Sequence, residues 1–280
     1  MEQEKSFIEI LDESLQNKKF TPPVFNRTGL QIQEQLGSEN PDIRVVEKLI
    51  TCDQTLTSQV LRMANSAFFR GISKITTVRD AMVRLGTEQI ANIALLSSQK
   101  SMFQTDNPII KNVLTSLWQH SVGCAMGAHW IAGACNLHSR AREAFTSGLL
   151  HDMGKLYILT VAAELVRNKQ ISSVSHEVIL KEAINALHTT YGHDLLTSWN
   201  LPEIYAIVAR DHHLEEFDPK NDLLVIIRLA DLTCNKLGVG TREHTDIILA
   251  ATAEADHLGL SEIKTAELEI RVEDAIGLAR

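Results

Sequence analysis

The sequence predicts an all-α protein built as two helical lobes. Only 6 prolines and 14 glycines interrupt the 280 residues, and apolar residues recur mostly at helical spacing. In residues 56–64 the apolar positions that fall on one helical face are Leu56, Val60, Met63 and Ala64. No persuasive alternation of apolar and polar residues indicates a β-strand.

Two further signals place helices in the first part of the chain. Ile90 and Ile93 repeat the helical spacing. Thr77–Asp80 is a variant of the capping box and predicts a helix that runs through Leu85. Gly86 is expected to end that helix, because glycine is common just past a helix C-terminus.

Turn-forming residues divide the chain into three parts. We predict a first helical lobe over residues 1–104, since residues 105–108 (Thr-Asp-Asn-Pro) form a turn-rich break. The second lobe covers residues 105–240 and holds every candidate site residue. An acidic helical extension follows over residues 241–280, and residues 238–241 (Gly-Val-Gly-Thr) resemble a hinge at its start.

Composition excludes several classes of function. The net charge of −8 argues against a general nucleic-acid binder, which grips phosphates with clustered Lys and Arg. No apolar stretch is long enough to cross a membrane, and residues 1–5 lack the features of a secretion signal. The four cysteines contain no Cys-x-x-Cys pair, as expected for reduced residues of a cytoplasmic protein: Cys52, Cys124, Cys135 and Cys234.

The pair His151-Asp152 is the strongest candidate for a functional site. It follows an apolar helical run and combines an imidazole with a carboxylate, two ligand types that suit a metal able to activate water. Asp231 interrupts a second apolar run that begins at Leu223, and a buried carboxylate needs a partner. Other candidate ligands along the chain are His120, His188, His212 and His213.

Each of these residues also has an ordinary explanation. His120 alone could be a satisfied core histidine, and His212-His213 could be a polar helix end that faces solvent. Lys155, one turn after Asp152, could neutralise phosphate charge or could be a solvated cation near a helix end. The remaining histidines fit no ligand pattern and are expected to be structural or exposed: His129, His138, His244 and His257.

The order His … His-Asp … Asp resembles the HD superfamily of metal-dependent phosphohydrolases. With His188 and the His212-His213 doublet, the pattern is similar to the ligand set of the dinuclear HD-GYP cyclic-di-GMP phosphodiesterases. The chain departs from that subgroup, because residues 214–218 read Leu-Glu-Glu-Phe-Asp and no Gly-Tyr-Pro motif follows the doublet.

The remaining motifs resemble the HDOD domain, over roughly residues 20–240. Gln54 is a departure, since the family usually has proline after the aspartate. The motifs that carry the resemblance are Pro22-Pro23, residues 53–57, residues 60–69 with Ala64-Asn65-Ser66, Ile75, residues 81–86 and Trp199–Pro202. The resemblance implies a bacterial regulatory module that is helical throughout, with a second lobe of HD-domain type.

The resemblance also implies a two-metal site. His120, His151, Asp152 and Asp231 hold one ion in this interpretation, and Asp152 is able to bridge to the second. His188, His212 and His213 hold the second ion. His188 competes with His193 and His176 for this role, and the family's His-x-x-x-Gly pattern, completed by Gly192, favours His188.

The leading hypothesis is a cytoplasmic HDOD signalling protein that retains a metal centre and hydrolyses a phosphoester. Water activated by the ions attacks phosphorus in this scheme, with Asp152 and Lys155 as catalytic residues. One or two divalent ions are expected, with iron or manganese favoured and zinc or nickel as further candidates. The substrate would be a phosphorylated small molecule or a cyclic nucleotide.

The alternative hypothesis is a non-catalytic interaction module. In this interpretation the metal centre is structural or sensory, and the first lobe binds a signalling protein. A helix-turn-helix DNA-binding unit in the first lobe is disfavoured by its mixed charges and by the acidic chain. We expect neither nucleic acid nor membrane as a partner.

Overall fold

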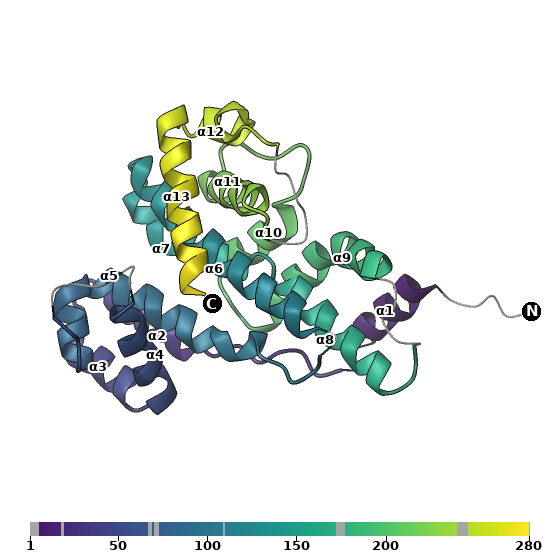
Figure 1. The fold of residues 1–280 in the computed structure, drawn as a ribbon, viewed down its shortest axis with the longest axis horizontal. Helices are drawn as coiled ribbons and strands as arrows, with labels where there is room; N and C mark the ends of the chain where they lie inside the picture. Colours follow the sequence, from purple (N-terminus) through teal and green to yellow (C-terminus); the bar gives the residue numbers. More distant parts are fainter. Residues whose placement is uncertain are drawn as a thin grey trace, which may run out of the picture.

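The computed structural model describes residues 6–17, 20–66, 69, 73–108, 110–171, 177–239 and 246–279, and within them it contains helices and no strand. The all-α prediction is therefore confirmed (Figure 1). Several residues discussed above lie outside the described part of the chain: Ala67, Phe68, His176, Gly240, Thr241 and His244.

The first four helices after α1 form a lobe of their own at one end of the molecule (Figure 1). Apolar side chains on the facing surfaces of these helices form a separate core, in which Leu56, Val60 and Ala64 are buried and Met63 is partly buried. The predicted apolar face of residues 56–64 is thus confirmed. The helices are α2 (Thr28–Gly37), α3 (Ile43–Thr51), α4 (Gln54–Ala64) and α5 (Val78–Gln99).

Asn65 explains why the Ala-Asn-Ser segment belongs to this lobe. Its side-chain amide donates to the carbonyl of Ile75 at 2.8 Å, and its side-chain oxygen accepts from the Ile75 N–H at 2.8 Å. This reciprocal pair ties the end of α4 to the segment that precedes α5. Ile75 is buried in the core of the lobe as a result.

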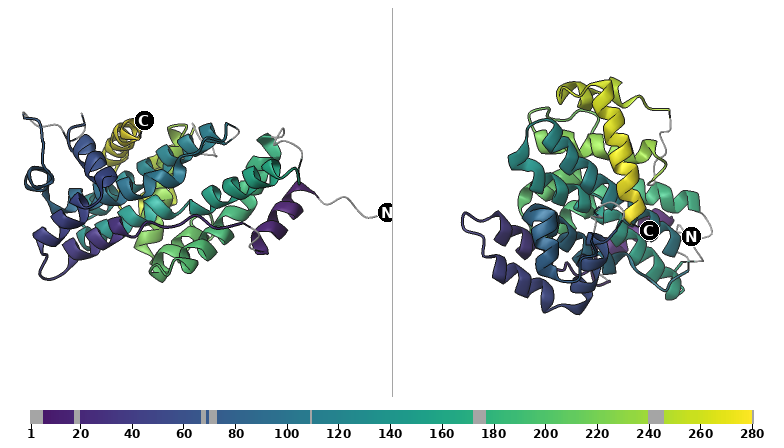
Figure 2. Two further views of the ribbon diagram at one scale, coloured as in Figure 1. Left: turned by 90° about the horizontal axis from the view of Figure 1, so that it is seen from below. Right: turned by 60° about the vertical axis from the view of Figure 1, so that its left-hand side comes forward.

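The long helix α6 (Lys111–Ala134) contributes side chains to two further cores. Figure 2 shows from two further sides how the helices are arranged. One core joins α6 to α1 (Phe7–Gln16) and to α7 (Ala141–Leu150), α8 (Met153–Arg167), α9 (Glu177–Ser198) and α10 (Glu203–Asp211). The other joins α6 to α11 (Asp222–Lys236), α12 (Ala253–His257) and α13 (Glu262–Leu278). Short 3-10 turns complete the chain: η1 (Lys100–Phe103), η2 (His138–Arg140) and η3 (Leu249–Ala251).

The first helix of the chain packs on the second lobe. Helix α1 packs on α8 and α9, and the stretch after it contacts the Trp199 segment. Trp199 donates its indole N–H to the Pro23 carbonyl at 3.0 Å and stacks on Phe25, with 5.2 Å between ring centroids. Two HDOD-like motifs that are far apart in sequence therefore touch. The boundaries at 104/105 and 240/241 stay predictions.

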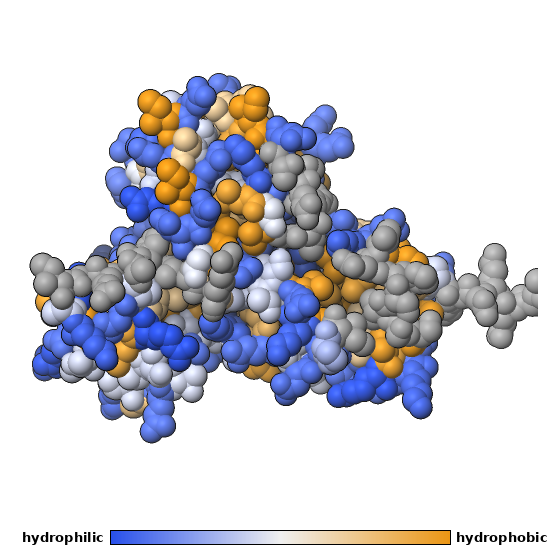
Figure 3. All heavy atoms as spheres, in the orientation of Figure 1, coloured by the Kyte–Doolittle hydropathy of each residue, from blue (hydrophilic) through white to orange (hydrophobic). Residues whose placement is uncertain are grey.

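Among the described helices, none is long and apolar enough to cross a membrane. On the face drawn in Figure 3 hydrophilic side chains predominate, and apolar residues form separate groups.

Gly86 sets a kink in α5. Thr77 caps the helix as predicted, because its hydroxyl accepts the Asp80 N–H at 3.0 Å. Gly86 interrupts the helical backbone with a φ of +78° and a ψ of 166°, a conformation that is essentially restricted to glycine. The predicted end at Gly86 is therefore real, but the chain resumes a helix at once and buries Ile90 and Ile93.

We predict that Gly86→Ala lowers the free energy of unfolding by about 1–3 kcal/mol, the usual cost of a non-glycine residue in such a conformation. The added methyl group meets no atom within 4 Å, so the backbone alone causes the loss. Urea unfolding followed by circular dichroism measures it. Gly133→Ala, a substitution within α6 that also meets no atom within 4 Å, is the control and should leave stability unchanged or slightly raised. Equal stability of the two variants would contradict the prediction.

Candidate metal centre

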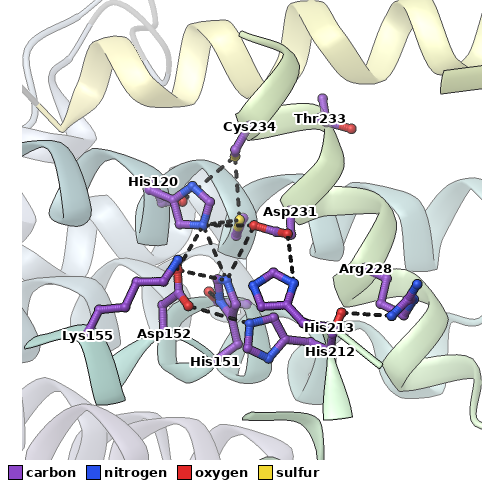
Figure 4. Close-up of polar contacts among 12 residues, drawn as sticks. His120, His151, Asp152, Lys155, His212, His213, Arg228, Asp231, Thr233 and Cys234 are labelled. Carbon is purple, nitrogen blue, oxygen red and sulfur yellow. Dashed lines mark hydrogen bonds and ion pairs between the residues drawn. The ribbon is translucent and has the colours of Figure 1, made fainter. Parts of the chain in front are cut away.

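The structure brings all seven predicted ligand residues together. Figure 4 shows how His120, His151, Asp152, His212, His213 and Asp231 point toward one another. His151 and Asp152 stand between α7 and α8, and Asp231 lies on α11. Six of the seven residues are buried, and His213 is half-buried. The other members come from α6 (His120), α9 (His188) and the end of α10 (His212, His213).

Gly154 allows α8 and α9 to approach closely enough to form the site. A β-carbon at this position would lie 1.9 Å from the His188 carbonyl oxygen and 2.7 Å from the Gly192 nitrogen. Both contacts are with backbone, which cannot move aside as a flexible side chain can. The glycine after His151-Asp152 thus lets His188 reach the pair.

Four of the histidines are oriented in the same way. Each places Nδ1 within 2.8–2.9 Å of a backbone carbonyl oxygen, which can only accept a hydrogen bond. Nδ1 therefore carries the hydrogen, and the Nε2 lone pair is directed to the centre, as in many metal-binding histidines. The carbonyls belong to Val239 (for His120), Gly148 (for His151), Ile184 (for His188) and Ala209 (for His212).

The Asp152 carboxylate faces two groups of ligands with its two oxygens. Oδ2 lies 3.2 Å from His120 Nε2 and 3.4 Å from His151 Nε2. Oδ1 lies 3.6 Å from His188 Nε2 and 3.5 Å from His212 Nε2. A carboxylate in this position can bridge two cations, one on each side.

Asp231 faces the same two groups from α11. Its Oδ1 lies 3.2 Å from His120 Nε2, and its Oδ2 lies 3.9 Å from His213 Nδ1. The neighbouring Arg228 holds the segment after α10 in place, because its guanidinium donates to the carbonyls of His212 at 2.9 Å and Leu214 at 2.8 Å. Helix α11 therefore supplies one carboxylate and also positions the histidine doublet.

The centre is crowded with hydrogen-bond acceptors. His120 Nε2 and His151 Nε2 are 3.3 Å apart, and Asp152 Oδ2 lies within 3.4 Å of both. The buried atoms Asp152 Oδ1, Asp231 Oδ1, His188 Nε2 and His212 Nε2 have no hydrogen-bond partner. Buried acceptors without donors are costly, and a cation satisfies them. The residues present thus fit a divalent metal ion, which is the kind of group that their ligand atoms prefer.

Burial acts to lower the pKa of His120, but the Asp152 and Asp231 carboxylates outweigh it and hold that pKa well above its usual range. A cation at the centre would therefore take the place of a proton on this imidazole. Burial lowers the pKa of His151 to about 4 and that of His188 to about 3, so both imidazoles are neutral near pH 7. Burial acts to raise the pKa of the Asp152 carboxyl, but Lys155 and the surrounding histidines together outweigh it and hold that pKa well below its usual range. Asp152 is therefore ionised.

Comparison with known proteins identifies the family. The HDOD domain matches residues 23–214, more than half of the chain. The chain belongs to the HDOD domain family. A protein from Treponema pallidum (strain Nichols), named only as uncharacterized, is 25% identical over 215 residues. That match covers 73% of this chain, which spans only 40% of the Treponema protein.

Solved structures share the HDOD fold. An HDOD domain protein of unknown function from Geobacter sulfurreducens has a TM-score of 0.77 at 21% identity, covering 97% of this chain and 96% of its own. A Shewanella amazonensis protein with the provisional name metal-dependent phosphohydrolase has a TM-score of 0.68 at 17% identity, covering 98% of both chains. At these identities the likeness establishes the fold.

Lys155 is buried within the metal centre. Its side chain is 3% exposed, and Nζ lies 2.7 Å from Asp152 Oδ2. The interpretation as a solvated cation is therefore wrong, because water cannot surround a side chain that is buried in this way. Lys155 places a positive charge where Asp152 contacts the first group of histidines.

Cys124 is a candidate ligand that the sequence reasoning missed. Its Sγ lies 3.5 Å from His120 Nε2, and Cys124, His120, His151 and Asp231 present ligand atoms within 4.8 Å of one another. Asp152 joins His188, His212 and His213 in a second such group. The signal that could have revealed Cys124 is its spacing, since residues four apart lie on the same face of a helix.

The other described histidines lie away from the centre. His193 contacts Asp194 with 3.2 Å between Nδ1 and Oδ1, and His129 contacts Glu88 with 3.0 Å between Nε2 and Oε1. His138 and His257 are exposed. The expectation that His129, His138 and His257 take no part in the ligand pattern agrees with these positions. The choice of His188 over His193 agrees as well.

We predict that protein purified without chelators carries two divalent ions per chain and that Asp152→Asn carries at most one. Asp152 faces both groups of ligands, and an amide is a weaker ligand than a carboxylate for a divalent ion. Elemental analysis by mass spectrometry measures the content. Asp194→Asn, an exposed carboxylate on α9, is the control. Unchanged metal content in Asp152→Asn would rule out the bridging role.

Cobalt substitution tests the role of Cys124. A thiolate bound to Co²⁺ produces a charge-transfer absorption that nitrogen and oxygen ligands do not give. We expect this absorption in the wild-type protein and its loss in Cys124→Ser. The adjacent Cys234, whose Sγ is 3.5 Å from that of Cys124 but which is outside the ligand group, provides the control variant Cys234→Ser. Absorption that survives in Cys124→Ser would exclude the thiolate as a ligand.

Proposed function

We propose that this HDOD protein is a metal-dependent phosphohydrolase that acts on a phosphoester. The observation that carries the proposal is the cluster of buried acceptors around Asp152, which calls for cations on both sides of one carboxylate. The provisional name of the Shewanella amazonensis relative points in the same direction.

The ligand residues divide the work between two groups. His120, His151 and Asp231, joined by Cys124, would hold one ion, and His188, His212 and His213 would hold the other. Asp152 faces both groups and would be shared between them. When bound, the ions supply Lewis acidity and lower the pKa of water. Backbone carbonyls fix four imidazole rings, so these ligands need no reorganisation.

The charges of the site suit a phosphate group. Asp152 and Asp231 carry two negative charges, and Lys155 carries one positive charge. Two divalent cations therefore leave the centre with a net positive charge, which attracts an anionic ester despite the acidic chain. Lys155 adds a cation that can stabilise negative charge developing on a phosphoryl oxygen.

His213 marks the side from which a substrate approaches. It is the most exposed of the seven residues, with 14% of its side chain accessible. The remaining ligands are almost fully enclosed by α6, α8, α9 and α11. A phosphoester would therefore enter past His213 and Asp231.

This enclosure also favours a second candidate function. A centre whose ligands are nearly all buried resembles a structural metal site, because a catalytic ion keeps a coordination position open to substrate. In this alternative the HDOD protein is a regulatory module. Its metal centre would hold helices α6 to α11 together without catalysing a reaction.

Hydrolysis assays separate the two functions. We expect the metal-loaded protein to hydrolyse bis-p-nitrophenyl phosphate or a cyclic dinucleotide, and Lys155→Gln to retain metal but lose roughly 100-fold in kcat, as when one transition-state donor is removed. Asp152→Asn should lose both metal and turnover, whereas Asp194→Asn should lose neither. Full metal content without turnover on any of these substrates would support the regulatory module instead.

A further inference from the structure

A cavity lies on the side of α6 that faces away from the metal centre, where the first lobe meets the end of the chain. It has a volume of about 630 Å³ and is bounded by α4, α5, α6 and α13. In Figure 1 the C-terminal end of α13 comes down beside α6 and the first lobe. The volume falls within the range of about 300–1,000 Å³ that is typical of small-molecule sites.

The cavity is rich in positive charge that is not neutralised. Arg62, Lys100 and Arg271 line it, and Asp274 is the one acid among the described lining residues. Within the described part of the chain, none of the three cations forms an ion pair. Burial and the nearby Arg62 lower the pKa of Lys100, as expected for a cation without a counter-ion. An anion would relieve this repulsion.

The lining also contains buried polar groups that lack partners. Trp118 is 4% exposed, and its indole nitrogen, which can only donate, has no hydrogen-bond partner. The hydroxyls of Ser66 and Ser97 and the side-chain oxygen of Gln59 lack partners as well. Natural proteins rarely leave such groups unsatisfied, and each one requires an explanation. A ligand with several acceptors and donors provides one.

Apolar side chains complete the lining. Met63, Leu96 and Val122 lie among the polar residues, and Val122 shares helix α6 with Trp118. The cavity thus combines cations, unpaired hydrogen-bonding groups and apolar surface. A nucleoside phosphate has the matching parts, since its phosphate is anionic, its sugar is polar and its base has a flat apolar face.

We propose that the cavity between the first lobe and α13 is a binding site for a nucleoside phosphate. The phosphate lies among Arg62, Lys100 and Arg271, the polar edges of the sugar and base meet Ser97 and the indole N–H of Trp118, and the base packs on the apolar side chains. The site is separate from the metal centre and does not depend on the proposed hydrolase activity.

The geometry of α6 supports this separation. Trp118 and Val122 each stand two residues from His120, and two residues correspond to about 200° of rotation around a helix. The cavity residues therefore project to the side of α6 opposite the metal centre. One rigid helix carries both sites.

Isothermal titration calorimetry with AMP, GMP, CMP and UMP, and with adenosine and inorganic phosphate for comparison, tests the proposal. At least one nucleotide should bind more tightly than adenosine or phosphate alone, and its affinity should fall as salt is added. Lys100→Gln and Arg62→Gln should each weaken binding roughly tenfold or more, as for a lost hydrogen bond to a charged group. Arg62 is exposed, so its variant tests the site without disturbing the core.

The controls show whether a loss of binding is specific to the cavity. Lys111→Gln removes an exposed cation at the start of α6 and should bind the nucleotide as the wild type does. Asp194→Asn, an exposed carboxylate on α9, should also bind it normally. The proposal is overturned if no nucleotide binds, if adenosine binds equally well, or if Lys100→Gln and Arg62→Gln bind the nucleotide as tightly as the wild type.

Discussion

The architecture of the second lobe depends on one buried carboxylate. Asp152 is enclosed by the helices of that lobe, and its two oxygens face the Nε2 atoms of four histidines. Lys155 balances one of the two negative charges in the centre, but it leaves the acceptors on the far side of Asp152 unsatisfied. Such an arrangement is costly without a cation. The metal centre and the fold of the second lobe are therefore coupled, because helices α6 to α11 both supply the ligands and enclose them.

Close helix packing makes this convergence possible. At Gly154 the absence of a side chain lets α8 contact the backbone of α9, and His188 is then within reach of Asp152. The carbonyl of Val239, just after α11, fixes the ring of His120, and Arg228 on α11 fixes the doublet at the end of α10. Each ligand is thus oriented by backbone or by a residue on a neighbouring helix. The ligand side chains are therefore oriented before an ion binds, and such orientation favours metal affinity.

The sequence predicted the helical class and the residues of the centre, but not how they are held. Helical periodicity located the face of Leu56 and Val60, and the capping residue Thr77 and the end at Gly86 could be read from local chemistry. The order of histidines and aspartates implied the ligands through family resemblance. Cys124 was missed because a lone cysteine in an apolar helix reads as core, and the burial of Lys155 depends on contacts that local patterns do not encode. The position of α1 on α8 and α9 was equally inaccessible, since it depends on long-range packing.

Helix α6 gives the molecule a physical route between its two candidate sites. His120 belongs to the metal centre, while Trp118 and Val122 line the cavity on the opposite side of the same helix. Trp118 and His120 are two residues apart on α6, about half a turn of the helix. Coupling between sites requires an element that both ligands bias, and α6 is the described helix that contributes residues to both. Both candidate sites therefore depend on the placement of one helix.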